Sequence, residues 1–198
     1  QIIQLLDWGC EEFVIIRNPE FEDLIKKVTT EAFPSLNLKF ATQDEPKGIS
    51  HALKQAEVHV DRDEKILFIL GDNFFEKNPI IDFDLSQYKK GSYIFTKSVN
   101  NPQEFGVAQM DSNGNVISID EKPIAPKSDL AVVGIYIFDE TVFKKISILT
   151  PSSRGEYEIT DLCNVYVQEN TCKNFVIDGW WIDAGTPDRI IELEEKLP

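Results

Sequence analysis

The segment Lys65–Asn73 reads KILFILGDN, an apolar run that ends in a glycine, a carboxylate and a carboxamide. A continuous apolar run of this length predicts a strand that is buried on both faces, as in the sheets of α/β proteins. The carboxyl ends of such strands are where these sheets bind ligands. Asp72 therefore indicates contact with a cation, a phosphate or a sugar hydroxyl, although Gly, Asp and Asn also terminate ordinary strands.

Strands and helices alternate on both sides of this segment, and the pattern predicts an α/β fold. Helices are expected at 2–8, 19–32, 49–58, 139–146, 159–169 and 187–197, and further strands at 12–17, 36–41, 92–99, 105–111, 116–120, 130–138, 174–177 and 181–183. This order predicts a mixed, mainly parallel sheet flanked by helices. A hairpin turn is expected at Asn113-Gly114, where both residues would take positive φ. Because no linker or repeat divides the chain, we expect one domain over residues 1–198.

Composition excludes several classes of partner. The chain has 198 residues and a formal net charge of -14, so neither nucleic acid nor an acidic membrane surface is an expected partner. No apolar stretch reaches the length of a membrane span, and no secretory leader opens the sequence. Cys10, Cys163 and Cys172 show no metal-site spacing, which predicts a reducing, cytoplasmic location. His51 and His59 indicate no histidine metal site.

Two loops carry residues suited to a nucleotide and a sugar phosphate. QDEPKG at 43–48 follows a predicted strand, so Gln43 could contact a base edge and Gly48 could let a flat ring approach the backbone. DEKP at 120–123 places Glu121 and Lys122 on opposite faces of a strand end, where they could bind sugar hydroxyls and a phosphate. A generic polar loop and a solvated charge pair are the alternatives.

Two further positions complete the set of candidates. Arg154, next to Gly155, could contact a phosphate or a carboxylate. Asp183 ends a second apolar strand, and together with Asp72 it would suit Mg²⁺, which proteins hold with one or two carboxylates and substrate oxygens.

In this order, the segments resemble the sugar-nucleotide pyrophosphorylases, a nucleotidyltransferase family, and most closely its glucose-1-phosphate thymidylyltransferases. The resemblance implies a Rossmann-like fold of the nucleotide-diphospho-sugar transferase type and Mg²⁺ as cofactor. It also implies transfer of a nucleotidyl group from dTTP to glucose 1-phosphate, which gives dTDP-glucose and pyrophosphate. It is carried by these segments: 43–52, 71–73, 105–107, 121–123, 133–136, 154–161 and 181–186.

The resemblance also implies a role for each matching residue. Asp72, Lys122, Arg154 and Asp183 would be catalytic, and Asp72 and Asp183 would hold the metal. Residues that bind the nucleotide would be Gln43, Pro46, Gly48, Gly71 and Asp72. Residues that bind the sugar phosphate would be Gly106, Glu121, Lys122, Val133, Tyr136 and Arg154.

One part of the family pattern does not occur in residues 1–198. Family members begin with a strand and a glycine-rich loop, L-A-G-G-x-G-x-R, whereas the segment 1–6 resembles a later helix. We therefore expect the domain to be incomplete at its N-terminus and residues 1–198 alone to be inactive. Three alternatives stay open: a non-catalytic homologue that binds a sugar nucleotide or a partner subunit, the same chemistry with UTP, or the same chemistry with another sugar. A homo-oligomer also stays open.

Overall fold

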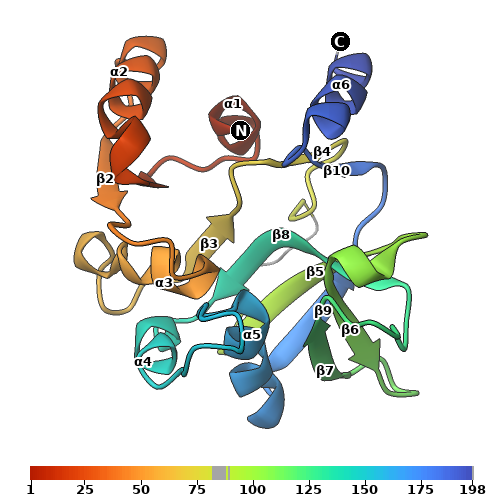
Figure 1. The fold of residues 1–198 in the computed structure, drawn as a ribbon. Helices are drawn as coiled ribbons and strands as arrows, with labels where there is room; N and C mark the ends of the chain where they lie inside the picture. The colour runs from red at the N-terminus through yellow and green to blue at the C-terminus, as the bar shows by residue number, and fades with distance from the viewer. Residues whose placement is uncertain (82–87, 89, 198) are drawn as a thin grey trace.

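The computed structural model describes residues 1–81, 88 and 90–197, and it shows an α/β fold (Figure 1). The helices are α1 (Ile2–Asp7), α2 (Glu22–Ala32), α3 (Ile49–Lys54), α4 (Val142–Ile146), α5 (Ile159–Gln168) and α6 (Pro187–Lys196), with short 3₁₀ turns η1 (Pro19–Phe21), η2 (Glu57–His59) and η3 (Pro102–Glu104). The strands are β1 (Phe13–Arg17), β2 (Leu38–Thr42), β3 (Ile66–Ile69), β4 (Asn73–Phe75), β5 (Ser92–Ser98), β6 (Gly106–Met110), β7 (Val116–Glu121), β8 (Leu130–Phe138), β9 (Cys172–Val176) and β10 (Trp181–Asp183). Each predicted helix and strand is confirmed, with ends shifted by a few residues, whereas β4 was not predicted.

In the described residues, the largest sheet has six strands in the order β7-β6-β8-β5-β9, with β3 also paired to β8. Strand β8 runs antiparallel to β3, β5 and β6, and β7 runs antiparallel to β6, whereas β9 is parallel to β5. Consequently β3, β5, β6 and β9 point one way and only β7 and β8 point the other. This arrangement confirms the predicted mixed, mainly parallel sheet.

Strand β8 joins two hydrophobic cores. Tyr136 and Phe138 pack on one face with α4 and α5, while Val133, Ile135 and Ile137 pack on the other face with Phe75, Tyr93 and Trp181 among others. Successive side chains of a strand point to opposite faces, so a strand that is apolar at nearly every position is buried on both sides. The sheet is therefore anchored at its centre by β8.

Two smaller strand pairs flank this sheet. Strands β1 and β2 pair in parallel, and β4 pairs antiparallel with β10 so that Asn73 lies opposite Asp183. Each strand of the second pair has only three residues. The pair nevertheless joins two segments that lie far apart in the sequence.

A cavity of about 1210 Å³ separates β1 from β3, and both strands line it. Among the described residues, β1 pairs only with β2, and β3 pairs only with β8. The side chains of β3 are therefore only partly buried, although the sequence predicted burial on both faces. The prediction is wrong in this respect because one edge of β3 faces open space.

The hairpin between β6 and β7 also differs from expectation. Only Gly114 has positive φ, at +82°, and Asn113 does not. Instead, the side chain of Asp111 accepts hydrogen bonds from the backbone N–H groups of Asn113 and Asn115, both at 2.8 Å. A side-chain acceptor can replace a backbone turn in this way, so the turn needs only one residue with positive φ.

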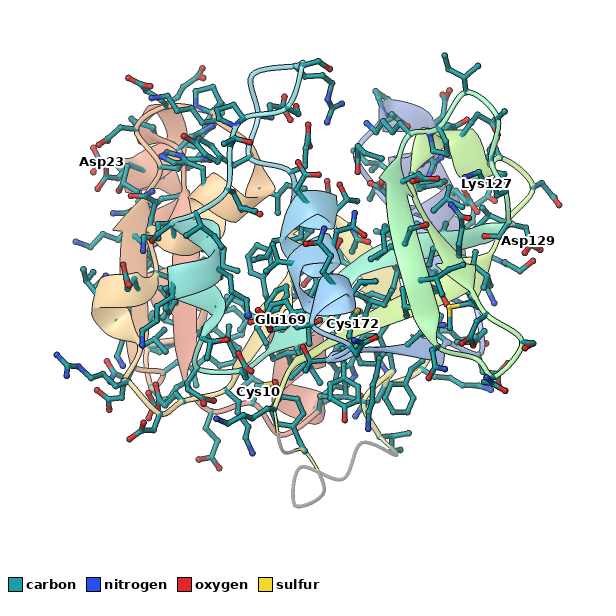
Figure 2. All side chains as sticks on the ribbon, turned by 90° about the horizontal axis from the view of Figure 1, so that it is seen from below. Cys10, Asp23, Lys127, Asp129, Glu169 and Cys172 are labelled. Carbon is teal, nitrogen blue, oxygen red and sulfur yellow. The ribbon has the colours of Figure 1, made fainter. Side chains whose placement is uncertain are left out.

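The two views agree on the overall arrangement. The β1–β2 pair with α2 lies at one end of the molecule, the β6–β7 hairpin lies at the other, and α5 lies between them (Figures 1 and 2). In Figure 2, Asp23 marks the first end, and Lys127 and Asp129 mark the second. None of the helices in the described part of the chain combines the length and the apolar character that a membrane crossing requires.

Candidate active site

The pairing of β4 with β10 brings Asp72 and Asp183 to one place. The backbone N–H of Ala184 donates to the carbonyl oxygen of Asp72 at 2.7 Å, which holds the two strand ends together. A Cβ atom added to Gly185 would lie 3.1 Å from Asp183 Oδ1 and 3.5 Å from Asp72 Oδ2. Both carboxylates therefore face the space beside Gly185.

The electrostatics of this space suit a divalent cation. Burial raises the pKa of Asp183, and the negative charge of Asp72 raises it further. A cation between the two carboxylates would relieve this repulsion. In the described residues no three His, Cys, Asp or Glu side chains converge as a metal cluster. Two carboxylates completed by ligand and water oxygens are what Mg²⁺ typically uses, so the residues present fit that ion.

Glu121 and Gly106 form a second part of the site. They lie opposite each other on β7 and β6, and a Cβ on Gly106 would lie 2.8 Å from Thr160 Cγ2 and 3.5 Å from Glu121 Oε2. The glycine therefore leaves room beside the carboxylate. Burial raises the pKa of Glu121, with a further contribution from the negative charge of Glu158. A half-buried carboxylate of this kind is a suitable acceptor for sugar hydroxyls.

Lys122 directly follows the last residue of β7. Its φ is +42°, an uncommon value for a residue other than glycine, and its backbone N–H donates to Phe105 O at 3.0 Å. Burial raises the pKa of both Asp183 and Glu121, and the positive charge of Lys122 acts against that shift in each. Lys122 is exposed, and within the described part of the chain no carboxylate lies within ion-pair distance of its ammonium group. Its charge therefore remains available to an anionic ligand.

Arg154 is already engaged by carboxylates. Its Nη2 lies 2.9 Å from Glu158 Oε2, 3.4 Å from Glu156 Oε2 and 3.6 Å from Glu121 Oε1. The sequence analysis missed Glu158, although its position four residues after Arg154 was an available signal. These three carboxylates largely neutralise the guanidinium group and compete with a phosphate for it. The role of Arg154 as a phosphate contact stays a prediction.

Val133 and Tyr136 lie in the core of the sheet. Val133 is fully buried, and the Tyr136 ring stacks on Phe138 with centroids 5.8 Å apart. Burial raises the pKa of the Tyr136 hydroxyl well above its ordinary value. Both residues are therefore closed to solvent in this structure, and their roles at a sugar phosphate stay predictions.

The predicted nucleotide residues meet at the large cavity. Gln43, Pro46, Gly48 and Gly71 all line it, although they come from two distant loops. The Gln43 side-chain nitrogen donates to Gly48 O at 3.0 Å and lies 3.0 Å from His51 Nδ1. His51 lies on α3, and its ring nitrogens have Gln43 and Gln55 as neighbours. The loop and the end of β3 thus face one space.

Comparison with known proteins places this site in a family. The family model for nucleotidyl transferases matches residues 1–198. The chain belongs to the nucleotidyl transferase family. The glucose-1-phosphate thymidylyltransferase of Mycolicibacterium smegmatis is 31% identical over 192 residues, which cover 94% of this chain and 66% of that protein. The UTP–glucose-1-phosphate uridylyltransferase AglF of Haloferax volcanii is 30% identical over 198 residues, which cover 98% of this chain and 80% of that protein.

A solved structure supports the same conclusion. A Bacillus anthracis protein assigned as a glucose-1-phosphate thymidylyltransferase, in complex with sucrose, matches with a TM-score of 0.87 and 34% identity over 98% of this chain and 79% of that one. The agreement of fold and sequence confirms the nucleotidyltransferase fold. The chain spans from 46% to 66% of the length of several of the curated relatives that it matches.

Proposed function

We propose that the protein transfers a nucleotidyl group from a nucleoside triphosphate to a sugar 1-phosphate. A phosphate oxygen of the sugar 1-phosphate bonds to the α-phosphorus, the bond from that phosphorus to the oxygen bridging the β-phosphate breaks, and pyrophosphate leaves with the electron pair. The observation that carries the proposal is the convergence of Asp72 and Asp183 beside Gly185. Such a transfer needs positioning and charge neutralisation more than covalent help.

Different residues of the site would bind the metal, the sugar 1-phosphate and the base. Asp72 and Asp183 would hold Mg²⁺, which neutralises phosphate charge and aligns the phosphates when bound. Lys122 binds the phosphate of the sugar 1-phosphate, because its charge has no protein partner within ion-pair distance among the described residues. Glu121 accepts hydrogen bonds from sugar hydroxyls in the room left by Gly106. Gln43 and Gly48 contact the base at the cavity that they share with Gly71.

Within this class we propose dTTP and glucose 1-phosphate as substrates and dTDP-glucose as product. The proposal is supported by relatives named glucose-1-phosphate thymidylyltransferase. A relative named for UTP makes UTP the competing substrate. A single methyl group separates thymine from uracil, so the shape of the pocket at Gln43 and Gly48 would decide between the two bases. The cytoplasmic location is proposed on the basis of the unpaired cysteines.

The test is a Mg²⁺-dependent assay of pyrophosphate release with the full-length gene product. Nucleoside triphosphates and sugar 1-phosphates are screened in pairs, and dTTP with glucose 1-phosphate is expected to give the highest kcat/KM. Asp72→Ala and Asp183→Asn are expected to lower the rate by at least about 100-fold, because several kcal/mol of charge stabilisation are lost. The control is Asp178→Asn, which changes an exposed carboxylate paired with Lys77 and should leave the rate unchanged.

Two outcomes would overturn the proposal. Full activity in Asp183→Asn would contradict the assignment of Asp183 as a ligand of Mg²⁺. Binding of a sugar nucleotide by calorimetry, without pyrophosphate release from any substrate pair, would favour a regulatory or partner module instead.

A further inference from the structure

Asn73 is a buried residue whose side chain is hydrogen-bonded to two strands of the candidate site, β8 and β10, and to Asp72. It is 2% exposed and begins β4, directly after Asp72. Its Oδ1 accepts hydrogen bonds from the backbone N–H of Gly134 in β8 at 2.9 Å and from Trp181 Nε1 in β10 at 2.7 Å. Its Nδ2 donates to Asp72 Oδ1 at 2.8 Å.

The two N–H donors determine the orientation of the carboxamide. Backbone and indole N–H groups can only donate, so the atom between Gly134 and Trp181 must be the oxygen of Asn73. The amide nitrogen must then point toward Asp72. If the amide were flipped, its NH₂ group would face the N–H groups of Gly134 and Trp181. Two donors would then lack an acceptor inside a buried site, which is costly.

Gly134 provides the space for this arrangement. A Cβ atom at position 134 would lie 2.6 Å from both Cγ and Oδ1 of Asn73, closer than side-chain carbons approach other atoms. The absence of a side chain at Gly134 therefore lets the Asn73 carboxamide pack directly against the backbone of β8. Any other residue at 134 would displace Asn73 from its three hydrogen bonds.

We propose that Asn73 is a positioning residue that holds the Asp72 carboxylate in the orientation needed for the metal. The inference rests on the proposed function, because it assigns a purpose to the orientation of Asp72. Asp72 itself is exposed, and without a hydrogen bond its carboxylate could rotate among rotamers. With Oδ1 held by Asn73, Oδ2 is left facing Gly185 and Asp183. Trp181 and Gly134 act through Asn73, since they hold its oxygen.

The test measures metal affinity without substrates. Mn²⁺ alone is titrated into the full-length gene product, and binding is followed by water-proton relaxation. Groups that orient a metal ligand typically contribute 10- to 100-fold in metal affinity, so Asn73→Ala should raise the Kd for Mn²⁺ by at least about 10-fold. Trp181→Phe removes only the indole donor and should raise the Kd by a smaller factor, roughly threefold.

A matched control separates positioning from general destabilisation. Asn164 also uses both ends of its carboxamide, accepting from Ile119 N at 2.9 Å and donating to Ile119 O at 2.7 Å, but it does not contact Asp72. Asn164→Ala should therefore leave the Kd for Mn²⁺ within twofold of the parent value. A structural readout in the metal-free protein is the Trp181 indole ¹H–¹⁵N resonance, which should shift in Asn73→Ala and stay in place in Asn164→Ala.

The outcomes distinguish this inference from the function on which it rests. Weaker Mn²⁺ binding in Asp72→Ala with unchanged binding in Asn73→Ala would overturn the positioning role alone. Equal binding in Asp72→Ala and the parent protein would overturn the metal assignment itself. If Asn73→Ala does not fold, Trp181→Phe decides, and an unchanged Kd in that variant would overturn the inference.

Discussion

At the scale of single residues, the backbone at position 48 has two features that only a glycine can accommodate. Its φ is +98°, and a Cβ would lie 2.7 Å from Tyr157 O and 2.8 Å from Tyr157 N. The first constraint is conformational, whereas the second comes from a loop more than a hundred residues away in the sequence. Both act on the loop that carries Gln43, so the geometry of the proposed base site depends on this glycine.

Gly48→Ala is expected to lower the free energy of unfolding by roughly 2–3 kcal/mol, because positive φ and a close contact each add a cost. It should also raise the KM for the nucleotide. Gly114→Ala is the control, since Gly114 has φ +82° but no atom within 4 Å of its Cβ position, and it should cost only about 1 kcal/mol. Chemical denaturation measures both. Equal losses in the two variants would show that the Tyr157 contact does not constrain the loop.

Glu121 illustrates a conflict between stability and binding. Its pKa is raised above the ordinary 4.5, first by burial and then by Glu158. A carboxyl group with a higher pKa in the folded state binds protons more tightly when folded, so its contribution to stability falls as pH rises from 4.5 through the raised pKa. At pH 7, the charged Glu121 is therefore unfavourable for folding.

Glu121→Gln is expected to raise Tm at pH 7, to lose this gain as the pH approaches 4, and to increase the KM for the sugar 1-phosphate. Thermal unfolding between pH 4 and pH 7 measures the first two effects. Glu156→Gln removes a more exposed carboxylate from the same arginine and should not raise Tm at pH 7. A lower Tm in Glu121→Gln at pH 7 would show that the carboxylate stabilises the fold instead.

At the scale of elements, β1 and β8 differ in how their edges are satisfied. Strand β8 has neighbours on both sides, whereas β1 is paired only with β2 in the described residues and faces the large cavity. Helix α2, which follows β1, buries none of its residues and leaves Leu24 and Val28 exposed. Few contacts therefore hold the β1–β2 part of the chain.

We expect backbone amides of β1 to exchange with solvent at least ~100-fold faster than those of β8, because local opening needs little energy where few contacts are broken. Hydrogen exchange followed by NMR on residues 1–198 measures the ratio. Within one sample, β5 serves as the reference, since it pairs with β8 and β9. Equal protection of β1 and β8 would mean that the cavity is closed in solution.

At the scale of the whole molecule, the net charge of -14 contrasts with the two anionic substrates that we propose. The contrast is resolved locally, because a bound cation and a single unpaired lysine can dominate the potential inside a small site. Lys122 supplies that lysine, while Arg154 is occupied by Glu158. The negative surface elsewhere then favours solubility more than it opposes binding.

We propose that residues 1–198 form one domain, as the sequence predicts. Calorimetry should then show one transition with an enthalpy of about 0.7 kcal/mol per residue near 60 °C. Local opening of β1 and β2 is compatible with this result, since it occurs below the global transition. Two separate transitions would divide the chain into independent units.

The sequence was a good guide to elements and to candidate residues, and a poor guide to contacts. Apolar periodicity located β8 because burial on both faces leaves a continuous apolar run. The same rule misjudged β3, whose free edge depends on neighbours that are distant in the chain. Strand β4 was missed because three residues carry no periodic signal, and its strand character comes from pairing with β10.

The sequence alone determined the α/β class, the family resemblance and the two strand ends that carry Asp72 and Asp183, because these depend on local patterns. Only the tertiary structure decided that the two carboxylates share one space, that Arg154 is paired with Glu158, and that Tyr136 is a core residue. It also brought Asn73 together with Gly134 and Trp181, which lie more than sixty residues away in the sequence. Hydrogen bonds and charge pairs act over a few ångströms in space, and no local pattern in the chain encodes such distances.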